Sequence, residues 1–161
     1  MEVVENLKEH ELDFHIAIGA MSQSTIGFRG TKTATYTIQP DAALALCTFD
    51  NGKPNAKLNG GVVVGMYDKG MIPSQRLIND FKAFTNANGY FGMIGNDSSF
   101  IHKTVKGCPT VAAGIACGNT GSANEMVSIN DMDALVHTLT DYILHLNNEM
   151  ITDFGFGEHH V

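Results

Sequence analysis

Cysteine and histidine side chains are the first candidates for chemistry in this sequence. Cys47, inside "ALALCTF", would form a thiol–imidazole nucleophile pair if His102 or His15 lay beside it. The alternative is a small side chain that packs inside a strand, which is the common role of a free cysteine in an apolar run. Cys47, Cys108 and Cys117 are odd in number and have no C-x-x-C spacing. The sequence therefore predicts neither a disulfide framework nor a zinc ribbon.

Two short segments suggest other kinds of site. "GEHHV", residues 157–161, offers two imidazoles and a carboxylate, which are adequate ligands for a transition metal. The alternative is an incidental pair of histidines in a frayed tail. "GNTGSANE", residues 118–125, is rich in glycine but does not open a helix with the spacing of a phosphate-binding loop. We interpret it as a connecting loop and not as a nucleotide site.

The elements that would position these side chains alternate between strand and helix. Short apolar runs predict strands at residues 14–20, 42–49, 61–66, 90–94 and 110–115. Helices are predicted at residues 3–7, from Pro73 to the "NANG" stop, after an Asp97 cap with Val105 turned inward, and after an Asp131 cap. "TKTATYTI" has a period of two, which taken alone indicates a strand. Alternation of this kind is typical of a layered α/β fold.

Length and charge limit what the chain does. Its 161 residues suit one domain, which we place at residues 1–150, followed by a flexible tail at residues 151–161. A net charge of −7 and scattered basic residues disfavour nucleic acid and anionic membranes as partners. The acidic start "MEVVENLKEHELD" is unlike an export signal, and no apolar run is long enough to span a membrane. We expect a cytoplasmic protein.

Six segments occur in an order that resembles one enzyme family. They are "LKEHELDFHIAIGAMSQSTIGFRGTKTA", "IQPDAALALCTF", "GVVVGMYDKGMIPSQRLIND", "IGNDSSFIH", "GCPTVAAGI" and "GSANEMVSINDM". Each is similar to a motif in the C-terminal half of the catalytic domain of M42-family aminopeptidases, the glutamyl and deblocking aminopeptidase group of dimetal enzymes. The resemblance covers nearly the whole chain. It implies a truncated zinc-peptidase-like domain with three α/β/α layers and a mixed, mostly parallel sheet, and it implies a helix in "GFRGTKTATYT".

The resemblance also identifies the positions of the family's site in this sequence. They are Ser24, Thr25, Cys47, Asp97, Gly121 and Ser122. The general-base glutamate falls on Ser24, a metal-binding glutamate on Thr25, an aspartate ligand on Cys47 and a histidine ligand on Gly121. Asp97 is retained but is not a metal ligand of the family. The two remaining ligands, a histidine and a bridging aspartate, would lie upstream of this sequence.

Replacement of these acids changes the chemistry that the resemblance would otherwise imply. Two divalent cations such as zinc or cobalt need carboxylates and imidazoles to offset the loss of their hydration. The hydroxyls of Ser24 and Thr25 stay protonated near neutral pH and supply neither charge nor a general base. We therefore expect no bound metal and no peptidase catalysis, and a homologue that acts through protein–protein contacts or peptide binding. The alternatives are an active metal-dependent hydrolase with rearranged ligands, and a hydrolase based on Cys47.

Missing upstream strands would leave a long apolar edge on the sheet. Such an edge needs to be covered, because its unpaired backbone groups pair readily with another chain. We expect either a homo-oligomer or a hetero-complex with a peptidase-like chain that supplies the N-terminal strands.

Overall fold

Five strands form one mixed sheet in the computed structural model, which describes residues 1–93 and 95–155. The strands are β1 (Ala43–Asp50), β2 (Val63–Tyr67), β3 (Asn88–Phe91), β4 (Thr110–Gly118) and β5 (Met126–Val127). Their order is β1-β4-β2-β3, with β5 beside β4. β1 is parallel to β4 and β2 is parallel to β3, whereas β4 runs antiparallel to β2 and to β5. The parallel pairings are the longer ones, so the prediction of a mixed, mostly parallel sheet is confirmed.

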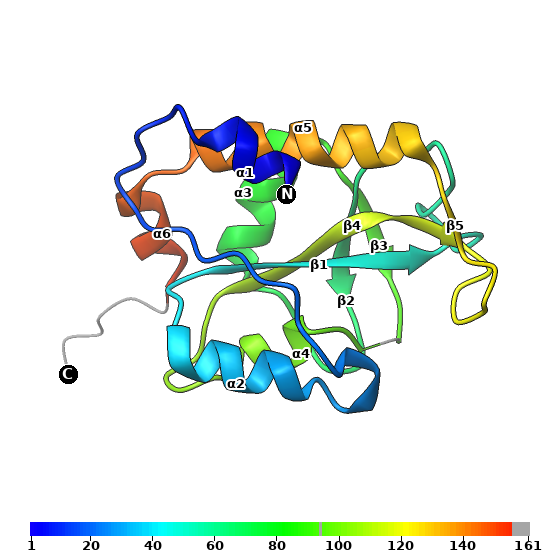
Figure 1. The fold of residues 1–161 in the computed structure, drawn as a ribbon, viewed down its shortest axis with the longest axis horizontal. Coiled ribbons are helices and arrows are strands. Elements are labelled where there is room, and N and C mark those ends of the chain that lie inside the picture. Colours follow the sequence, from blue (N-terminus) through cyan, green and yellow to red (C-terminus); the bar gives the residue numbers. More distant parts are fainter. Residues whose placement is uncertain (94, 156–161) are drawn as a thin grey trace.

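Helices cover both faces of this sheet and complete three layers (Figure 1). On one face lie α1 (Glu2–Leu7), α3 (Gln75–Thr85), α5 (Ile129–His145) and α6 (Asn148–Phe154). On the other face lie α2 (Arg29–Ile38) and α4 (Ser98–Ile101), with the 3₁₀ helix η1 (Ser24–Ile26) just before α2. Each face of the sheet has its own apolar cluster, and successive side chains of β2 point into opposite clusters. Val64 packs with Phe81 and Tyr142 on one face. Val63 packs with Phe49 and Tyr90 on the other.

The segment with a period of two is a helix, as the family resemblance implies. In α2, Thr31 and Thr35 are buried one turn apart, while Thr33 and Thr37 are exposed. The hydroxyls of Thr35 and Thr37 donate to the carbonyl oxygens four residues earlier, at 2.7 and 3.0 Å. Such bonds let threonine, a modest helix former, satisfy its hydroxyl inside a helix. The strand prediction from alternation was wrong here.

The two predicted helix caps have different outcomes, and the one at Asp131 is wrong. α5 is capped by Ser128, whose side chain accepts a hydrogen bond from the backbone of Asp131. Asp131 instead lies buried, 2% exposed, and accepts hydrogen bonds from the backbone N–H groups of Asn59 and Gly61, both at 2.8 Å. Asp97 is the N-cap residue of α4, as predicted, although its carboxylate makes no cap hydrogen bond. Val105, which was predicted to face the core, is 58% exposed.

The predicted strand at residues 14–20 is irregular chain in this structure, and most of it is exposed. No backbone hydrogen bond involves residues 11–21 among the described parts of the chain. The strand predicted at 90–94 is β3, which starts earlier and ends at Phe91, and residue 94 lies outside the described residues.

The far end of the chain is partly helical. α6 runs to Phe154, which is buried, so the helix includes the first residues of the predicted tail. Residues 156–161 lie outside the described residues. No helix in the described chain has the length and apolar character to cross a membrane.

Candidate functional site

A cavity of about 390 Å³ lies between the sheet and the segments that lead into α2 and α4. β1 contributes residues 47–50, β2 and β3 contribute Gly65, Tyr67 and Tyr90, and η1 contributes Ser24 and Thr25. The loops after β2, β3 and β4 contribute Asp68, Met71, residues 95–97 and Thr120, and Phe28, just before α2, completes the lining. Strand ends and loops of an α/β sheet commonly meet in this way at a binding site.

The structure brings four of the six positions identified from the sequence to this cavity. Ser24, Thr25, Cys47 and Asp97 all line it, although they come from three separate stretches of chain. Gly121 and Ser122 do not line the cavity and lie in the exposed loop after β4, next to Thr120.

The carboxylate of Asp97 is held by hydroxyl groups. Its Oδ1 accepts a hydrogen bond from Ser24 Oγ at 3.2 Å and another from Thr31 Oγ1. Ser24 lies in η1, and Thr31 is a buried residue of α2. Asp97 therefore connects α2 to the start of α4, and Ser24, which the resemblance aligns with the family's general base, donates a hydrogen bond to it.

A second carboxylate, that of Asp68, is also engaged by its surroundings. Asp68 is 8% exposed, its Oδ1 accepts from the backbone N–H of Gly70 at 2.6 Å, and its Oδ2 accepts from Asn96 Nδ2 at 2.9 Å. The Oδ1 of Asn96 in turn accepts from the backbone of Ser98. These bonds hold the loop after β2 against the loop that leads into α4.

Asp50 at the end of β1 is the third carboxylate at the cavity. It accepts a long hydrogen bond of 3.4 Å from Thr120. Tyr90 lies nearby with its ring 4.9 Å from that of Phe49. Burial and, to a lesser degree, the charge of Asp50 raise the pKa of Tyr90, so the phenol stays protonated at neutral pH.

Cys47 is unsuited to nucleophilic chemistry. Burial, followed by the negative charges of Asp68 and Asp97, raises the pKa of its thiol to about 12. The thiolate is the reactive form of cysteine, and a pKa this high leaves almost none of it at neutral pH. Neither His102 nor His15 lines the cavity, and the Nδ1 of His102 lies 2.8 Å from the carbonyl oxygen of Ser98 in its own helix. The predicted thiol–imidazole pair is therefore absent from the described residues.

The donor set of the cavity does not fit a pair of divalent cations. No histidine lines it, Ser24 and Thr25 are neutral, and the Cys47 thiol is protonated. Its three carboxylates come from the end of β1 and from two separate loops. Nowhere in the described chain do three His, Cys, Asp or Glu side chains gather closely enough to hold a metal ion. The other predicted metal-binding segment, residues 157–161, lies outside the described residues.

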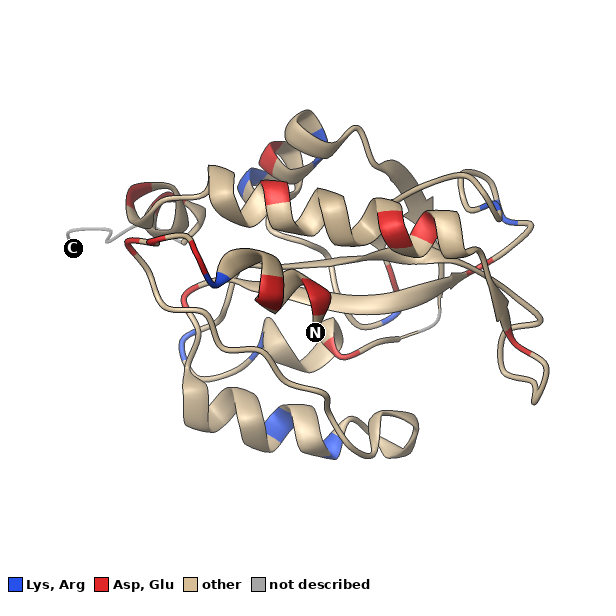
Figure 2. Ribbon diagram, turned by 45° about the horizontal axis from the view of Figure 1, so that its top comes forward, with Lys and Arg blue, Asp and Glu red and all other residues tan. Residues whose placement is uncertain are grey.

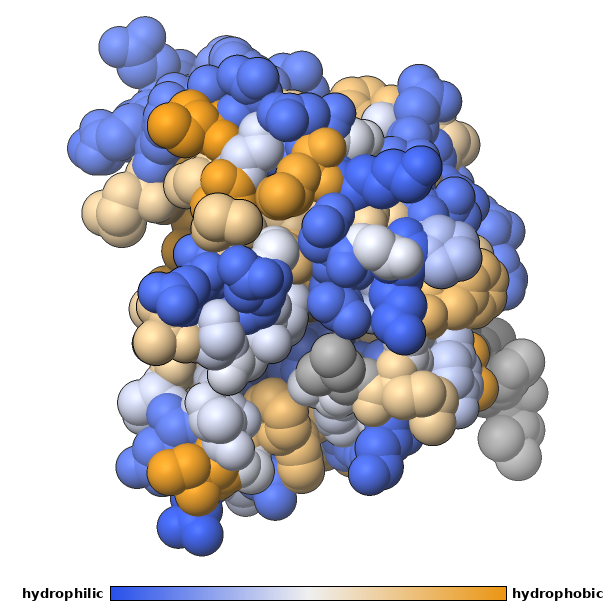
Figure 3. All heavy atoms as spheres, turned by 90° about the vertical axis from the view of Figure 1, so that its right-hand side faces the viewer, coloured by the Kyte–Doolittle hydropathy of each residue, from blue (hydrophilic) through white to orange (hydrophobic). Residues whose placement is uncertain are grey.

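Sequence reasoning missed Asp50 and Asp68 as cavity residues. A usable signal was present, since each aspartate directly follows an apolar strand run, "ALALCTF" and "GVVVGMY". Polar residues just after strands often line sites in α/β folds. Figure 3 views the side of the molecule towards which β1 and β4 run, and its surface is mostly hydrophilic, with apolar residues in small separate groups.

Comparison with known proteins places this fold in a family. The family model described as M42 glutamyl aminopeptidase matches residues 1–138. The glutamyl aminopeptidase of Lactococcus lactis subsp. cremoris (strain MG1363) is 28% identical over 95% of this chain and 46% of the relative.

Two solved structures show the same fold. The TET aminopeptidase from the marine sediment archaeon Thaumarchaeota archaeon SCGC AB-539-E09 has a TM-score of 0.76 and 27% identity, covering 84% of this chain and 42% of the other. The Pyrococcus horikoshii TET1 peptidase, described as able to assemble into a tetrahedron or a large octahedral shell, has a TM-score of 0.82 and 22% identity, covering 90% and 46%. The chain thus spans about half the length of the relatives it matches. Because the family model covers most of the chain and the three layers match solved aminopeptidases, the protein belongs to the M42 glutamyl aminopeptidase family.

Proposed function

We propose that this chain is a non-catalytic member of the M42 family that works through binding: protein–protein contacts, or a peptide held in the cavity beside Ser24 and Cys47. One observation carries the proposal, namely the chemistry of the four predicted positions that line the cavity. Two are hydroxyl side chains, one is a thiol with a pKa of about 12, and the fourth, Asp97, accepts hydrogen bonds from Ser24 and Thr31. The first three supply neither the general base nor the anionic ligands that two-metal hydrolysis requires, and the Asp97 carboxylate is already engaged by two hydroxyl groups.

An active hydrolase with rearranged ligands is the second candidate, because Asp50, Asp68 and Asp97 line the same cavity. The hydrogen bonds that these carboxylates already accept argue against metal binding by them. A metal would have to displace Gly70 and Asn96 from Asp68, and Ser24 and Thr31 from Asp97, and the displaced donors would lose their partners.

The proposal also includes an assembly. We propose a homo-oligomer, or a hetero-complex with a peptidase-like chain, in the cytoplasm. Assembly into a shell is described for the Pyrococcus horikoshii relative. Among the described residues, β1 has a strand partner on one side only.

Metal analysis and a peptidase assay test the loss of catalysis. The purified protein would be analysed by mass spectrometry for zinc, cobalt and manganese, and assayed on peptides with N-terminal Glu, Asp or Leu, with each metal and with a chelator. The Lactococcus lactis glutamyl aminopeptidase serves as a positive control. We expect well under about one ion per chain and no chelator-sensitive release of amino acids. About two ions per chain together with chelator-sensitive activity would contradict the proposal.

A further inference from the structure

The cavity described above carries negative charge without a matching cation. Asp50, Asp68 and Asp97 line it, and no Lys, Arg or His of the described chain does. None of the three aspartates takes part in an ion pair within the described chain, whose two ion pairs lie elsewhere. Burial, followed by the charges of Asp68 and Asp97, raises the pKa of the Cys47 thiol, as expected in a negative surrounding. The cavity therefore lacks the positive charge that would balance its carboxylates.

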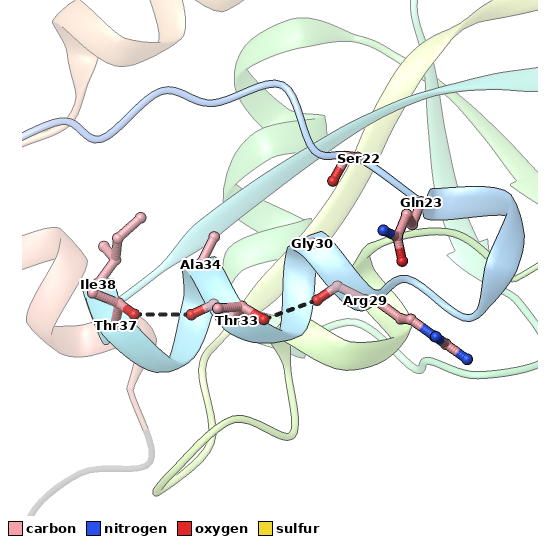
Figure 4. Close-up of a pocket in the computed structure, with 8 residues that line it drawn as sticks. All are labelled: Ser22, Gln23, Arg29, Gly30, Thr33, Ala34, Thr37 and Ile38. Carbon is pink, nitrogen blue, oxygen red and sulfur yellow. Dashed lines mark hydrogen bonds between the residues drawn. The ribbon is translucent and has the colours of Figure 1, made fainter.

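The basic residues of the neighbouring helix α2 are directed elsewhere. Arg29 lines a second depression, of about 690 Å³, which is bounded by α2 and the chain before it and has no acidic residue in its described lining (Figure 4). Lys32 lies over the ring of Phe100, with Nζ 4.3 Å from the ring centroid. Figure 2 shows the contrast in charge, since α2 carries blue positions and no red one. Positive charge is thus near the cavity in sequence but does not neutralise its carboxylates.

The three carboxylates are spread around the cavity and are not gathered at one point. Asp50 ends β1, Asp68 follows β2 and Asp97 precedes α4. No three His, Cys, Asp or Glu side chains of the described chain lie close enough to share one metal ion. Carboxylate lone pairs remain available, because Asp97 accepts both of its hydrogen bonds at Oδ1 and Asp50 accepts one long bond of 3.4 Å. Separate anionic groups suit a ligand whose positive charges are also separate.

Aromatic and apolar side chains line the same cavity. Phe28, Phe49, Tyr67 and Tyr90 contribute rings, and Met71 contributes a thioether. Aromatic rings attract ammonium groups through their π faces and pack well against methylene chains. An occupant that alternates ammonium groups with short methylene chains would therefore satisfy both the carboxylates and the apolar walls.

A buried hydroxyl beside the cavity has no hydrogen-bond partner. Ser99 is 5% exposed, and its Oγ makes no hydrogen bond within the described chain. This hydroxyl points towards Gly95, a lining residue, and lies 3.5 Å from the position that a Cβ on Gly95 would occupy. Because buried hydroxyl groups normally have a partner, Ser99 offers an additional acceptor to an ammonium group at this side of the cavity.

We propose that this cavity binds a linear aliphatic amine with two or more ammonium groups, the charge pattern of a polyamine. The separate carboxylates bind the ammonium groups, and the aromatic rings cover the methylene chains. A volume of about 390 Å³ is near the lower end of the range for small-molecule sites, which favours a free amine over a basic peptide. The inference rests on the proposed function, since it treats the cavity as a site of binding without catalysis.

An ammonium group also fits the existing hydrogen bonds better than a dication does. It donates hydrogen bonds to the lone pairs that remain on a carboxylate. It therefore displaces none of the donors that hold Asp68 and Asp97, namely Gly70, Asn96, Ser24 and Thr31.

Isothermal titration calorimetry of the purified, chelator-treated protein with spermidine tests the proposal. We expect saturable binding of one spermidine per chain, at least about tenfold tighter than binding of butylamine, which has a single ammonium group. A trilysine peptide carries several ammonium groups on a bulkier backbone and should bind more weakly than spermidine. Binding of spermidine should weaken as the salt concentration rises, because salt screens the attraction between ammonium and carboxylate groups.

Two conservative variants locate the binding site. Asp50→Asn and Asp97→Asn each keep an acceptor oxygen for the neighbouring threonine hydroxyl and should weaken spermidine binding at least about fivefold. The control Asp133→Asn makes the same change of charge on the exposed side of α5 and should bind spermidine as the wild type does. Circular dichroism of each variant shows whether it is folded, and Asp50→Asn disturbs only one long hydrogen bond.

Several outcomes would overturn the proposal. They are the lack of saturable spermidine binding, equal affinity for butylamine, tighter binding of trilysine, and equal weakening by Asp133→Asn. Any of them would leave the non-catalytic role intact, because metal content and peptidase activity test that role separately. Bound metal with chelator-sensitive activity would instead contradict the proposed function itself.

Discussion

Ser24 and Asp97 meet across the cavity, with Ser24 Oγ donating to Asp97 Oδ1 at 3.2 Å. Thr31 donates to the same oxygen from inside α2. Ser24, which the resemblance aligns with the family's general base, thus donates a hydrogen bond to a carboxylate. This hydrogen bond links η1 to the start of α4, so the replaced residue has a structural contact of its own.

Removal of the Asp97 carboxylate should therefore destabilise the protein. In Asp97→Ala the hydroxyl of Thr31, 1% exposed, loses its acceptor, which should lower the free energy of unfolding by about 1–3 kcal/mol. Asp97→Asn keeps an acceptor oxygen and should cost less than Asp97→Ala. Urea unfolding followed by circular dichroism measures both values. Equal losses in the two variants would show that the acceptor oxygen does not matter.

Substitution of Asp131 should lower the free energy of unfolding more than substitution of an exposed aspartate does. Its buried carboxylate accepts from the backbone of Asn59 and Gly61, which fixes the loop before β2 against α5. Asp131→Ala should lower the free energy of unfolding by about 2–3 kcal/mol, because two backbone donors lose a charged acceptor. Asp133→Ala, two positions later on the exposed side of α5, is the matched control and should change stability by less than about 0.5 kcal/mol. A similar effect of the two substitutions would refute this role.

Much of the fold could be predicted from local patterns because those patterns and the packing agree. α3 is an example: Leu77, Ile78 and Phe81 are buried on one face, and Asn86 ends the helix in a left-handed conformation. The apolar runs of β1, β2 and β4 also correspond to strands of the sheet. In these elements, residue type, spacing and burial give the same answer.

Other features depend on partners that are distant in sequence, which local patterns do not contain. α2 looked like a strand because threonine occupies every second position of "TKTATYTI". Asp97, however, accepts a hydrogen bond from Thr31, and Thr31 and Thr35 are buried together on one helix face. Asp131 looked like a cap because it lies near the start of a helix, and its actual partners are some seventy positions away in the sequence. Within the cavity, the family resemblance located Ser24, Thr25, Cys47 and Asp97, whereas Asp50 and Asp68 required the spatial arrangement of the strand ends.

The Cys47 thiol gives the stability of the protein a specific dependence on pH. Its pKa is about 12 in the folded protein and near 9.0 when unperturbed, so the folded state holds the proton more tightly. The protonated Cys47 thiol contributes fully to the free energy of unfolding below pH 9. This contribution is lost as the pH rises from 9 towards 12, because the thiol of the unfolded protein ionises first. Wild type should therefore lose more stability than Cys47→Ser between pH 9 and 11, measured by urea unfolding at each pH. Identical pH profiles for the two proteins would show that the thiol is not shielded.

Carboxylates introduced at two cavity positions should give the protein the metal affinity that the proposed function says it lacks. In Thr25→Glu/Cys47→Asp, two carboxylates join Asp68 and Asp97 around the cavity, and their mutual repulsion should lower the melting temperature of the metal-free protein. Cobalt or zinc should recover part of that loss in the double variant, because binding to the folded state alone raises its apparent stability.

The same metals should not stabilise the wild type, whose hydroxyl and thiol groups supply no charge at these two positions. Thermal unfolding with and without each metal measures the shift. The control Gln75→Glu/Asn79→Glu adds the same charge on the distant helix α3 and should show no recovery. If the wild type is stabilised by metal as strongly as the double variant, the cavity already holds dications with its present residues and the non-catalytic interpretation fails.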